Sequence, residues 1–470
     1  MNKAFYRPLI IIVTTIIFLG IIAAVVPGME NKVFNIKPFK WLGHLKDLAA
    51  KKTLVDVVAL SDSLKIASNL SAMEICQKRF AQLISNPSNS IRIAYFGDSI
   101  IEGDLITGQL RHNLQSKYGG TGVGFMPITS IVANFRQTIR HSFSKNWEVH
   151  SFMTHNSTIP LGISGFVFIP RNYYTIEKAV ETEQDTLISV SADSTSVKAP
   201  LNPPKETQRY YVDTPSWVRY QAADVIGGAA NFENIRLFYS HAKPESYIII
   251  HIDNQEPKKV LLNPGENLQT LTLNNSKPVK SLKLEFNPYD PIHVYGVSFD
   301  KNTGVYVDNF SIRGYSGMFF QRIPKDLLSS FNNILSYDLI ILQYGENVSN
   351  PKFKTYDFYY TGMVKTIKHL QEAMPNIPIL MISAHDRSIK QDGKYVTSPD
   401  IPFLVNTQGE IAKATNSAFW NLYDAMGGVN SMANFVNSTP PKASKDYTHF
   451  NRNGANYIGN LLTDVILNKK

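Results

Sequence analysis

The fold of this 470-residue chain is decided by the stretch Ile91-Arg92-Ile93-Ala94-Tyr95-Phe96-Gly97-Asp98-Ser99. Its first six residues are mostly apolar, a pattern typical of a strand buried inside a parallel β-sheet. Open α/β sheets carry their functional sites at the edge formed by the carboxyl ends of their strands. The sequence therefore predicts an α/β fold with Ser99 at that edge.

Two further segments supply groups that suit the same edge. The apolar run 339–343 predicts a second buried strand, and Asn347 follows it closely. Glycines in the segment 312–317 would let a backbone N–H approach a ligand without side-chain interference. The N–H groups of Ser99 and Gly317 and the side-chain amide of Asn347 are neutral donors, which stabilise an oxyanion in a dry site.

Asp446 and His449 lie three residues apart near the end of the chain, so on one helical turn they would share a face. The carboxylate could then hold the imidazole while its other nitrogen takes the proton of Ser99. These three residues indicate a serine hydrolase. A rival base is His385, which follows the predicted strand 379–383, but we favour His449.

The four motifs occur in a characteristic order, which is Gly-Asp-Ser (97–99), Ser-Gly (316–317), Gly-x-Asn (345–347) and Asp-x-x-His (446–449). This order resembles the SGNH hydrolases, also called the GDSL esterase/lipase family. The family's third motif commonly ends in an Asp, where this chain has Val348.

The resemblance implies a flavodoxin-like, three-layer α/β/α domain with a parallel sheet. It also implies the roles of five residues. Ser99 would be the nucleophile, Asp446 and His449 would complete the triad, and Gly317 and Asn347 would complete an oxyanion hole with the Ser99 N–H. This chemistry needs no cofactor and no metal, and the sequence has neither a His-x-x-x-His pair nor several Cys residues that would suggest one.

The chain is long enough for two to three domains. We assign residues 91–130 and 306–470 to the two parts of the hydrolase domain and residues 131–305 to an insertion. Short alternating runs such as 247–252 and 280–286, separated by turn residues, predict that the insertion is an antiparallel β-sandwich. A sandwich at this place in the chain resembles the layout of peptidoglycan O-acetylesterases within the family.

The insertion would suit glycan binding, because aromatic rings provide surfaces on which sugars stack. The alternative is that these aromatic side chains belong to the core of the sandwich. The candidates are Trp147, Trp217, Tyr210 and Tyr211.

The amino terminus predicts a membrane anchor. Residues 9–26 are apolar and uncharged, which is long enough to span a bilayer, and Lys3 and Arg7 precede them. We favour an uncleaved signal anchor over residues 1–28 in the inner membrane, with the hydrolase facing the periplasm or cell exterior. The alternative is a cleaved signal and secretion to the periplasm. Residues 29–90 predict a helical stalk or cap.

The remaining composition limits the partners. The single cysteine, Cys76, excludes an intramolecular disulfide and is interpreted as a buried small apolar residue. A net charge of +9 would draw an exported protein to anionic wall polymers or lipid head groups, unless the excess is evenly dispersed. Nucleic acid is a poor candidate, since no binding motif is present.

Three functions stay open at this point. The first is a cell-envelope serine carbohydrate esterase that removes O-acetyl groups from peptidoglycan or another polysaccharide. The second is an O-acetyltransferase that uses the same triad on an envelope glycan, and the residues alone do not separate water from sugar as the acceptor. The third is a non-catalytic glycan-binding protein. A lipase is disfavoured, because the sequence shows no apolar lid segment.

Overall fold

The computed structural model describes residues 89–155, 157–179, 205–301 and 303–468, together with a few positions between 74 and 86. The predicted anchor, most of the predicted stalk and Cys76 lie outside the described residues. The chain divides into two compact units, Met1–Ile66 and Ala67–Lys470, and all described residues belong to the second. No helix in this described part is long and apolar enough to cross a membrane.

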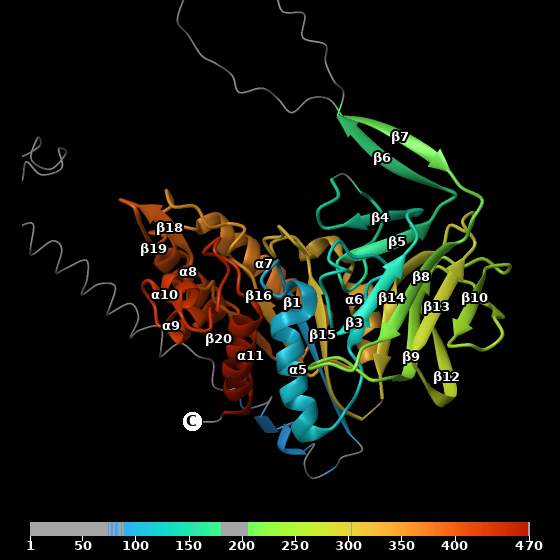
Figure 1. Cartoon of the computed structure of the whole chain (residues 1–470), viewed down its shortest axis with the longest axis horizontal. Coiled ribbons are helices and arrows are strands. Elements are labelled where there is room, and N and C mark those ends of the chain that lie inside the picture. The colour runs from blue at the N-terminus through green and yellow to red at the C-terminus, as the bar shows by residue number, and fades with distance from the viewer. Residues whose placement is uncertain are drawn as a thin grey trace, which may run out of the picture. The chain divides into compact units, whose positions relative to one another are not determined.

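The elements follow one another along the chain as labelled in Figure 1. The helices are η2 (Glu102–Asp104), α5 (Leu105–Tyr118), η3 (Phe320–Arg322), α6 (Lys325–Leu335), α7 (Asp357–Ala373), α8 (Ile401–Ala414), α9 (Leu422–Met426), α10 (Ser431–Asn437) and α11 (Arg452–Leu467). The strands of the parallel sheet are β1 (Ser90–Gly97), β15 (Gly304–Ser311), β16 (Leu339–Gln343), β17 (Ile379–Ile382) and β20 (Ala418–Trp420). The remaining strands are β2 (Gly124–Met126), β3 (Ile139–Phe143), β4 (Trp147–Ser151), β5 (Phe166–Pro170), β6 (Tyr173–Ala179), β7 (Lys205–Tyr211), β8 (Ser216–Ala222), β9 (Phe232–Ser240), β10 (Tyr247–Ile252), β11 (Lys258–Leu261), β12 (Gln269–Val279), β13 (Ser281–Phe286), β14 (His293–Asp300), β18 (Ser388–Gln391) and β19 (Lys394–Thr397).

The parallel sheet has the order β15-β1-β16-β17-β20, with all neighbours parallel. Counted along the chain, this is the order 2-1-3-4-5 of flavodoxin-like sheets. The order reverses at β1, and ligands of such sheets bind at this switch point. The sheet therefore places the segment after β1, which begins with Asp98 and Ser99, where a site is expected.

Helices shield the sheet on both faces, as the almost complete burial of β1 requires. On one face α5 and α11 pack together over Ile91, Ile93 and Tyr95 of β1 (Figure 1). On the other face the ring of Phe96 lies 4.9 Å from Phe310 and 5.2 Å from Phe320. The prediction of an α/β fold with a parallel sheet is confirmed.

The insertion consists mainly of two antiparallel sheets that share one apolar core. One sheet has the order β11-β10-β13-β8-β3, and the other has the order β12-β9-β14-β5-β4, with β2 added beside β14. Residues at alternating positions of β8 and β13 are buried, as expected for strands with one face on a core. The predicted antiparallel sheets are thus present, between the first and second strands of the parallel sheet.

The four candidate sugar-stacking residues differ in exposure. Trp147 is 8% exposed and packs edge-on against Phe286 at 5.2 Å, so it is a core residue. Trp217 is partly buried. Tyr210 and Tyr211 lie in the β6–β7 hairpin, where Tyr211 is 69% exposed. Of the four, Tyr211 has the most surface open to a ligand.

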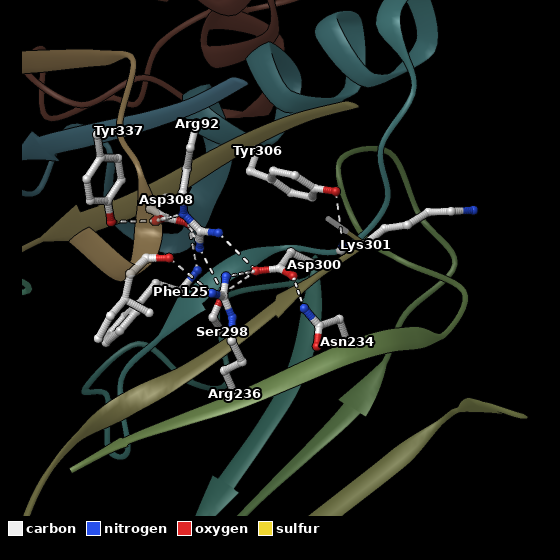
Figure 2. A network of polar contacts seen from close by, with 12 residues as sticks. Arg92, Phe125, Asn234, Arg236, Ser298, Asp300, Lys301, Tyr306, Asp308 and Tyr337 are labelled. Atoms are coloured by element: carbon white, nitrogen blue, oxygen red, sulfur yellow. Dashed lines mark hydrogen bonds and ion pairs between the residues drawn. The ribbon is translucent and has the colours of Figure 1, made fainter. Parts of the chain in front are cut away.

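Arg92 joins the two modules from the third position of β1 (Figure 2). Its guanidinium is 3% exposed and contacts Asp308 of β15 through Nε at 2.7 Å and Nη2 at 2.9 Å. It also donates to Asp300 at 3.0 Å and to Ser298 at 2.8 Å, both on β14 of the sandwich. Asp300 in turn accepts from Arg236 of β9 at 2.7 Å. One buried network therefore spans both modules.

The charges of this network are matched. Burial would lower the pKa of Arg92, but Asp308, Tyr337 and Asp300 raise it above its usual value. Burial would likewise raise the pKa of Asp300, but Arg92 and Arg236 hold it below its usual range. Arg92 is therefore a cation, and removing it would leave a buried carboxylate without its main partner.

We expect the substitution Arg92→Met to lower the free energy of unfolding by about 3–5 kcal/mol, because a broken buried ion pair leaves an uncompensated charge. Urea titration followed by circular dichroism measures the loss. The control is Lys301→Ala, which removes an exposed pair with Glu233 at 3.4 Å and should change stability by less than about 1 kcal/mol. Equal small losses in both variants would contradict a role for Arg92 in joining the modules.

Candidate active site

The turn that carries Ser99 is held by its neighbours in the sheet. The Ile312 N–H donates to the Gly97 carbonyl at 3.0 Å, which continues the β1–β15 pairing past the end of both strands. The side-chain amide of Asn309, on β15, donates to the Ile101 carbonyl at 2.7 Å. Ser99 itself is half-buried. The backbone around the predicted nucleophile is thus fixed from β15.

The structure brings Ser99, His449 and Asp446 together. The Oγ atom of Ser99 lies 3.0 Å from Nε2 of His449, and Nδ1 of His449 lies 2.8 Å from a carboxylate oxygen of Asp446. A carboxylate only accepts, so Nδ1 carries the hydrogen and Nε2 is free to accept from the Ser99 hydroxyl. This is the geometry of a serine nucleophile with its base and its orienting acid.

Asp446 and His449 do not lie on a helical turn as expected. They belong to an irregular turn just before α11, in which Tyr447 has a left-handed φ of 57°. The second oxygen of Asp446 accepts from the N–H groups of Thr448 and His449, both at 3.0 Å. This turn, rather than helical periodicity, brings the carboxylate and the imidazole together.

The electrostatics keep Asp446 ionised. Burial would raise its pKa, but hydrogen bonds from the His449 N–H, the His449 ring and the Thr448 N–H hold the pKa below its usual value. The side chains of both residues are open to solvent, with 50% of Asp446 and 42% of His449 exposed. The base of the triad therefore has direct access to water.

Asn347 bridges the segments after β1 and β15. Its Nδ2 donates to a carboxylate oxygen of Asp98 at 2.8 Å and to the Tyr315 carbonyl at 3.2 Å. The other oxygen of Asp98 accepts from the Ile100 N–H at 3.0 Å. The amide of Asn347 is thereby fixed beside the residue that precedes Ser99.

The predicted donor Gly317 lies on the buried side of its loop. A Cβ atom there would lie 2.7 Å from the Tyr344 ring, and its φ of +87° also favours glycine. Gly314, which the sequence analysis did not single out, has a φ of +78° and is exposed. Its neighbour Arg313 lines the cleft beside Ser99. The two glycines thus let the loop adopt left-handed backbone conformations on both sides of Tyr315.

The rival base does not reach Ser99. His385 is 1% exposed, its Nε2 lies 2.6 Å from the Thr448 carbonyl, and its Nδ1 lies 3.0 Å from Glu346. Both ring nitrogens are therefore engaged by other groups. In this arrangement His449 is the base available to Ser99.

A cleft of about 240 Å³ opens beside Ser99 and His449. A mainly apolar cavity of about 370 Å³ lies next to it between the two modules, and Glu102 and Arg313 line both. These two residues form an ion pair at 2.5 Å. Phe135, which lines the cleft, is 56% exposed, and Ile131, which lines the cavity, is 82% exposed. An exposed apolar segment, which the sequence analysis did not detect, thus flanks the site.

Metal ligands do not gather within the described residues, where no group of three His, Cys, Asp or Glu side chains could hold an ion.

The strand order, the position of the serine at the switch point and the triad geometry define the SGNH/GDSL hydrolase layout. The solved structure of a peptidoglycan O-acetylesterase is similar to this chain. It is 19% identical, with a TM-score of 0.60 over 83% of this chain and 94% of that chain. At this identity the likeness shows a shared fold.

A second solved structure is a family two carbohydrate esterase with a carbohydrate-binding domain from Corynascus thermopiles (Myceliophthora fergusii). It is 11% identical, covers 54% of this chain and 93% of its own, and has a TM-score of 0.26. Of these two likenesses, the first is close enough to show a common fold. No protein-family model and no curated protein matches the sequence.

The environment of Asp98 generates a prediction about pH. Burial raises its pKa to about 7, against the hydrogen bond from Ile100, and the nearby Glu346 carboxylate adds to the rise. Between about pH 4 and 7 the folded state therefore holds a proton that the unfolded chain has released, so ionisation of Asp98 destabilises the fold as pH rises. The variant Asp98→Asn lacks this ionisation.

We expect the stability of Asp98→Asn relative to the parent to rise between pH 4 and pH 7, by at most about 1.4 kcal/mol per pH unit. Urea unfolding of both proteins at each pH measures this difference, in which the effects of titrating groups that do not interact with Asp98 cancel. A difference that stays constant over this range would show that Asp98 is ionised throughout.

Proposed function

We propose that the protein is a cell-envelope serine carbohydrate esterase that removes O-acetyl groups from peptidoglycan or another polysaccharide. The observation that carries the proposal is the continuous hydrogen-bond chain from Ser99 through His449 to Asp446. The fold shared with a structure described as a peptidoglycan O-acetylesterase supports the choice of substrate class.

In the first half of the reaction, Nε2 of His449 takes the proton of the Ser99 hydroxyl while Oγ attacks the ester carbonyl. The imidazolium that forms is stabilised by Asp446, which accepts from Nδ1 at 2.8 Å. The same imidazolium then donates its Nε2 proton to the departing sugar oxygen. The products are a free sugar hydroxyl and an acetyl group bound to Ser99.

In the second half, His449 removes a proton from water, which attacks the acetyl-serine and releases acetate. Because 42% of the His449 side chain is exposed, water reaches this base without a conformational change. This exposure supports hydrolysis over transfer to a second sugar, although the same triad would serve a transferase.

The tetrahedral intermediates carry a negative oxygen that needs donors. We assign this role to the N–H of Ser99, the N–H of Gly317 and the amide of Asn347. Nδ2 of Asn347 has two hydrogens, and its hydrogen bond to the Tyr315 carbonyl is the longer of the two, at 3.2 Å. The oxyanion would take this hydrogen in place of the Tyr315 carbonyl. Asp98 keeps the amide oriented through the other hydrogen.

The proposed location is the outer face of the inner membrane, through the amino-terminal segment that the sequence analysis interprets as an anchor. A net charge of +9 supports attraction to an anionic wall polymer. The proposed partner is the acetylated polysaccharide itself, and the proposed mechanism uses no cofactor.

We expect the purified full chain to release acetate from O-acetylated peptidoglycan and from p-nitrophenyl acetate. Ser99→Ala should lower the rate about 10⁴-fold or more while its circular dichroism spectrum stays unchanged. Acetylation of an added glycan without acetate release would favour the transferase. If the folded parent acts on neither ester and transfers no acetyl group, the non-catalytic glycan-binding alternative gains support.

We also expect Asn347→Ala to lower kcat about a hundredfold or more, since one oxyanion donor is lost. Steady-state kinetics with p-nitrophenyl acetate measure the effect. The matched control is Asn406→Ala on α8, whose side chain donates to Glu410 at 3.4 Å on the surface and should leave kcat unchanged. A kcat of Asn347→Ala equal to that of the control would remove Asn347 from the oxyanion hole.

A further inference from the structure

A buried ion pair lies against the turn that carries Asp446 and His449. His385 follows β17 and is 1% exposed, and Glu346, whose side chain is 7% exposed, follows β16. Nδ1 of His385 is 3.0 Å from a carboxylate oxygen of Glu346. The imidazole is therefore the ion-pair partner of this buried carboxylate.

The contacts of His385 define its protonation state. Its Nε2 lies 2.6 Å from the Thr448 carbonyl, which only accepts, so Nε2 carries a hydrogen. Its Nδ1 faces the carboxylate of Glu346 and carries the second hydrogen. Burial would lower the pKa of His385, but Glu346, the Thr448 carbonyl and Asp98 raise it above its usual value. His385 is thus an imidazolium with both hydrogens committed.

The Thr448 carbonyl belongs to the peptide that enters His449. The turn around it is partly exposed. Its further contacts with the same region include a hydrogen bond from the Ser388 N–H to the Tyr447 carbonyl at 3.1 Å, the stacking of Tyr395 on Tyr447 at 3.5 Å and the packing of the Phe450 ring on the His385 ring at 4.8 Å. The first two act on Tyr447, two residues before the base, and the third is made by His385 itself. The bond from His385 acts directly beside His449.

We propose that His385, held in place by Glu346, is a positioning residue that fixes the Thr448 carbonyl and so aims His449 at Ser99. The inference rests on the proposed esterase function. His385 acts through the backbone of the turn and touches none of the reacting atoms. A charge-assisted hydrogen bond is shorter and stronger than a neutral one, which suits the task of holding an exposed turn.

Glu346 also links this support to the oxyanion hole. It directly precedes Asn347 in the loop after β16. This loop therefore carries both the carboxylate that pairs with His385 and the amide that donates to Asp98. Movement of this loop would displace the proposed base and the proposed oxyanion donor together. Misplacement of a catalytic group by about 1 Å lowers the rate about a hundredfold.

Two variants of the full chain separate the hydrogen bond from the charge. The double variant H385L/E346L replaces the ion pair by apolar side chains of similar volume, a change that buried pairs often tolerate in stability. It removes the bond to Thr448. The variant Glu346→Gln keeps that bond, because a neutral His385 still donates from Nε2 while its Nδ1 accepts from the glutamine amide.

With p-nitrophenyl acetate we expect H385L/E346L to lower kcat about tenfold to a hundredfold, with KM within about threefold of the parent. Glu346→Gln, which keeps the bond to Thr448 but removes the charge that strengthens it, should lower kcat by less than the double variant does. Labelling of Ser99 with a fluorophosphonate counts the folded active sites, so kcat is expressed per competent site. A kcat per site equal to that of the parent in the double variant would overturn the proposal.

Hydrogen exchange of residues 444–450 tests the same point without a substrate. We expect faster exchange in H385L/E346L than in the parent and in Glu346→Gln, and unchanged exchange would also overturn the proposal. If the double variant fails to fold, H385M/E346Q, which also removes the bond to Thr448 and leaves no buried charge, takes its place in both measurements. A parent that hydrolyses no ester but shows this exchange pattern would refute the esterase function and leave the role of His385 in holding the turn intact.

Discussion

The buried guanidinium of Arg92 is the constraint on which the arrangement of the two modules depends. It lies on β1, an interior strand of the parallel sheet, and its carboxylate partners Asp308 and Asp300 come from the two modules. Asp308 also accepts from the Phe125 N–H and the Tyr337 hydroxyl, so four chain segments meet at one charge (Figure 2). A buried charge without a partner costs several kcal/mol of stability. Any other arrangement of the two modules would separate these charges and would therefore be less stable.

Much of the fold could be predicted from the sequence, because buried parallel strands form continuous apolar runs and sandwich strands alternate. The run 91–96 became β1 and the run 339–343 became β16. The strand order required the structure, since it depends on pairing between distant segments. Arg92 gave no sequence signal as a junction, because a charged residue inside a strand normally indicates a solvent-facing position.

The candidate site also has features that could be predicted from the sequence and features that could not. Ser99, Asn347 and His449 follow recognisable short motifs, and the structure places the last within 3.0 Å of the first. The local conformation around His449 could not be predicted, because a left-handed Tyr447 replaces the expected helical turn. The contact of His385 with the Thr448 carbonyl could not be predicted either, because it joins the loops after β16 and β17 to the turn before α11, and no spacing along the chain encodes it.

The position of the sandwich in the chain has a consequence for folding. β1 and β15 are neighbours in the sheet, yet Ser90 pairs with Gly304, so their pairing closes a loop of more than two hundred residues. The entropic cost of such a closure falls when the intervening chain is already compact. Within the insertion, β2 pairs with β14 and so brings its two ends together. A sandwich that has already folded would therefore shorten the loop that the pairing of β1 with β15 must close, and so lower its entropic cost.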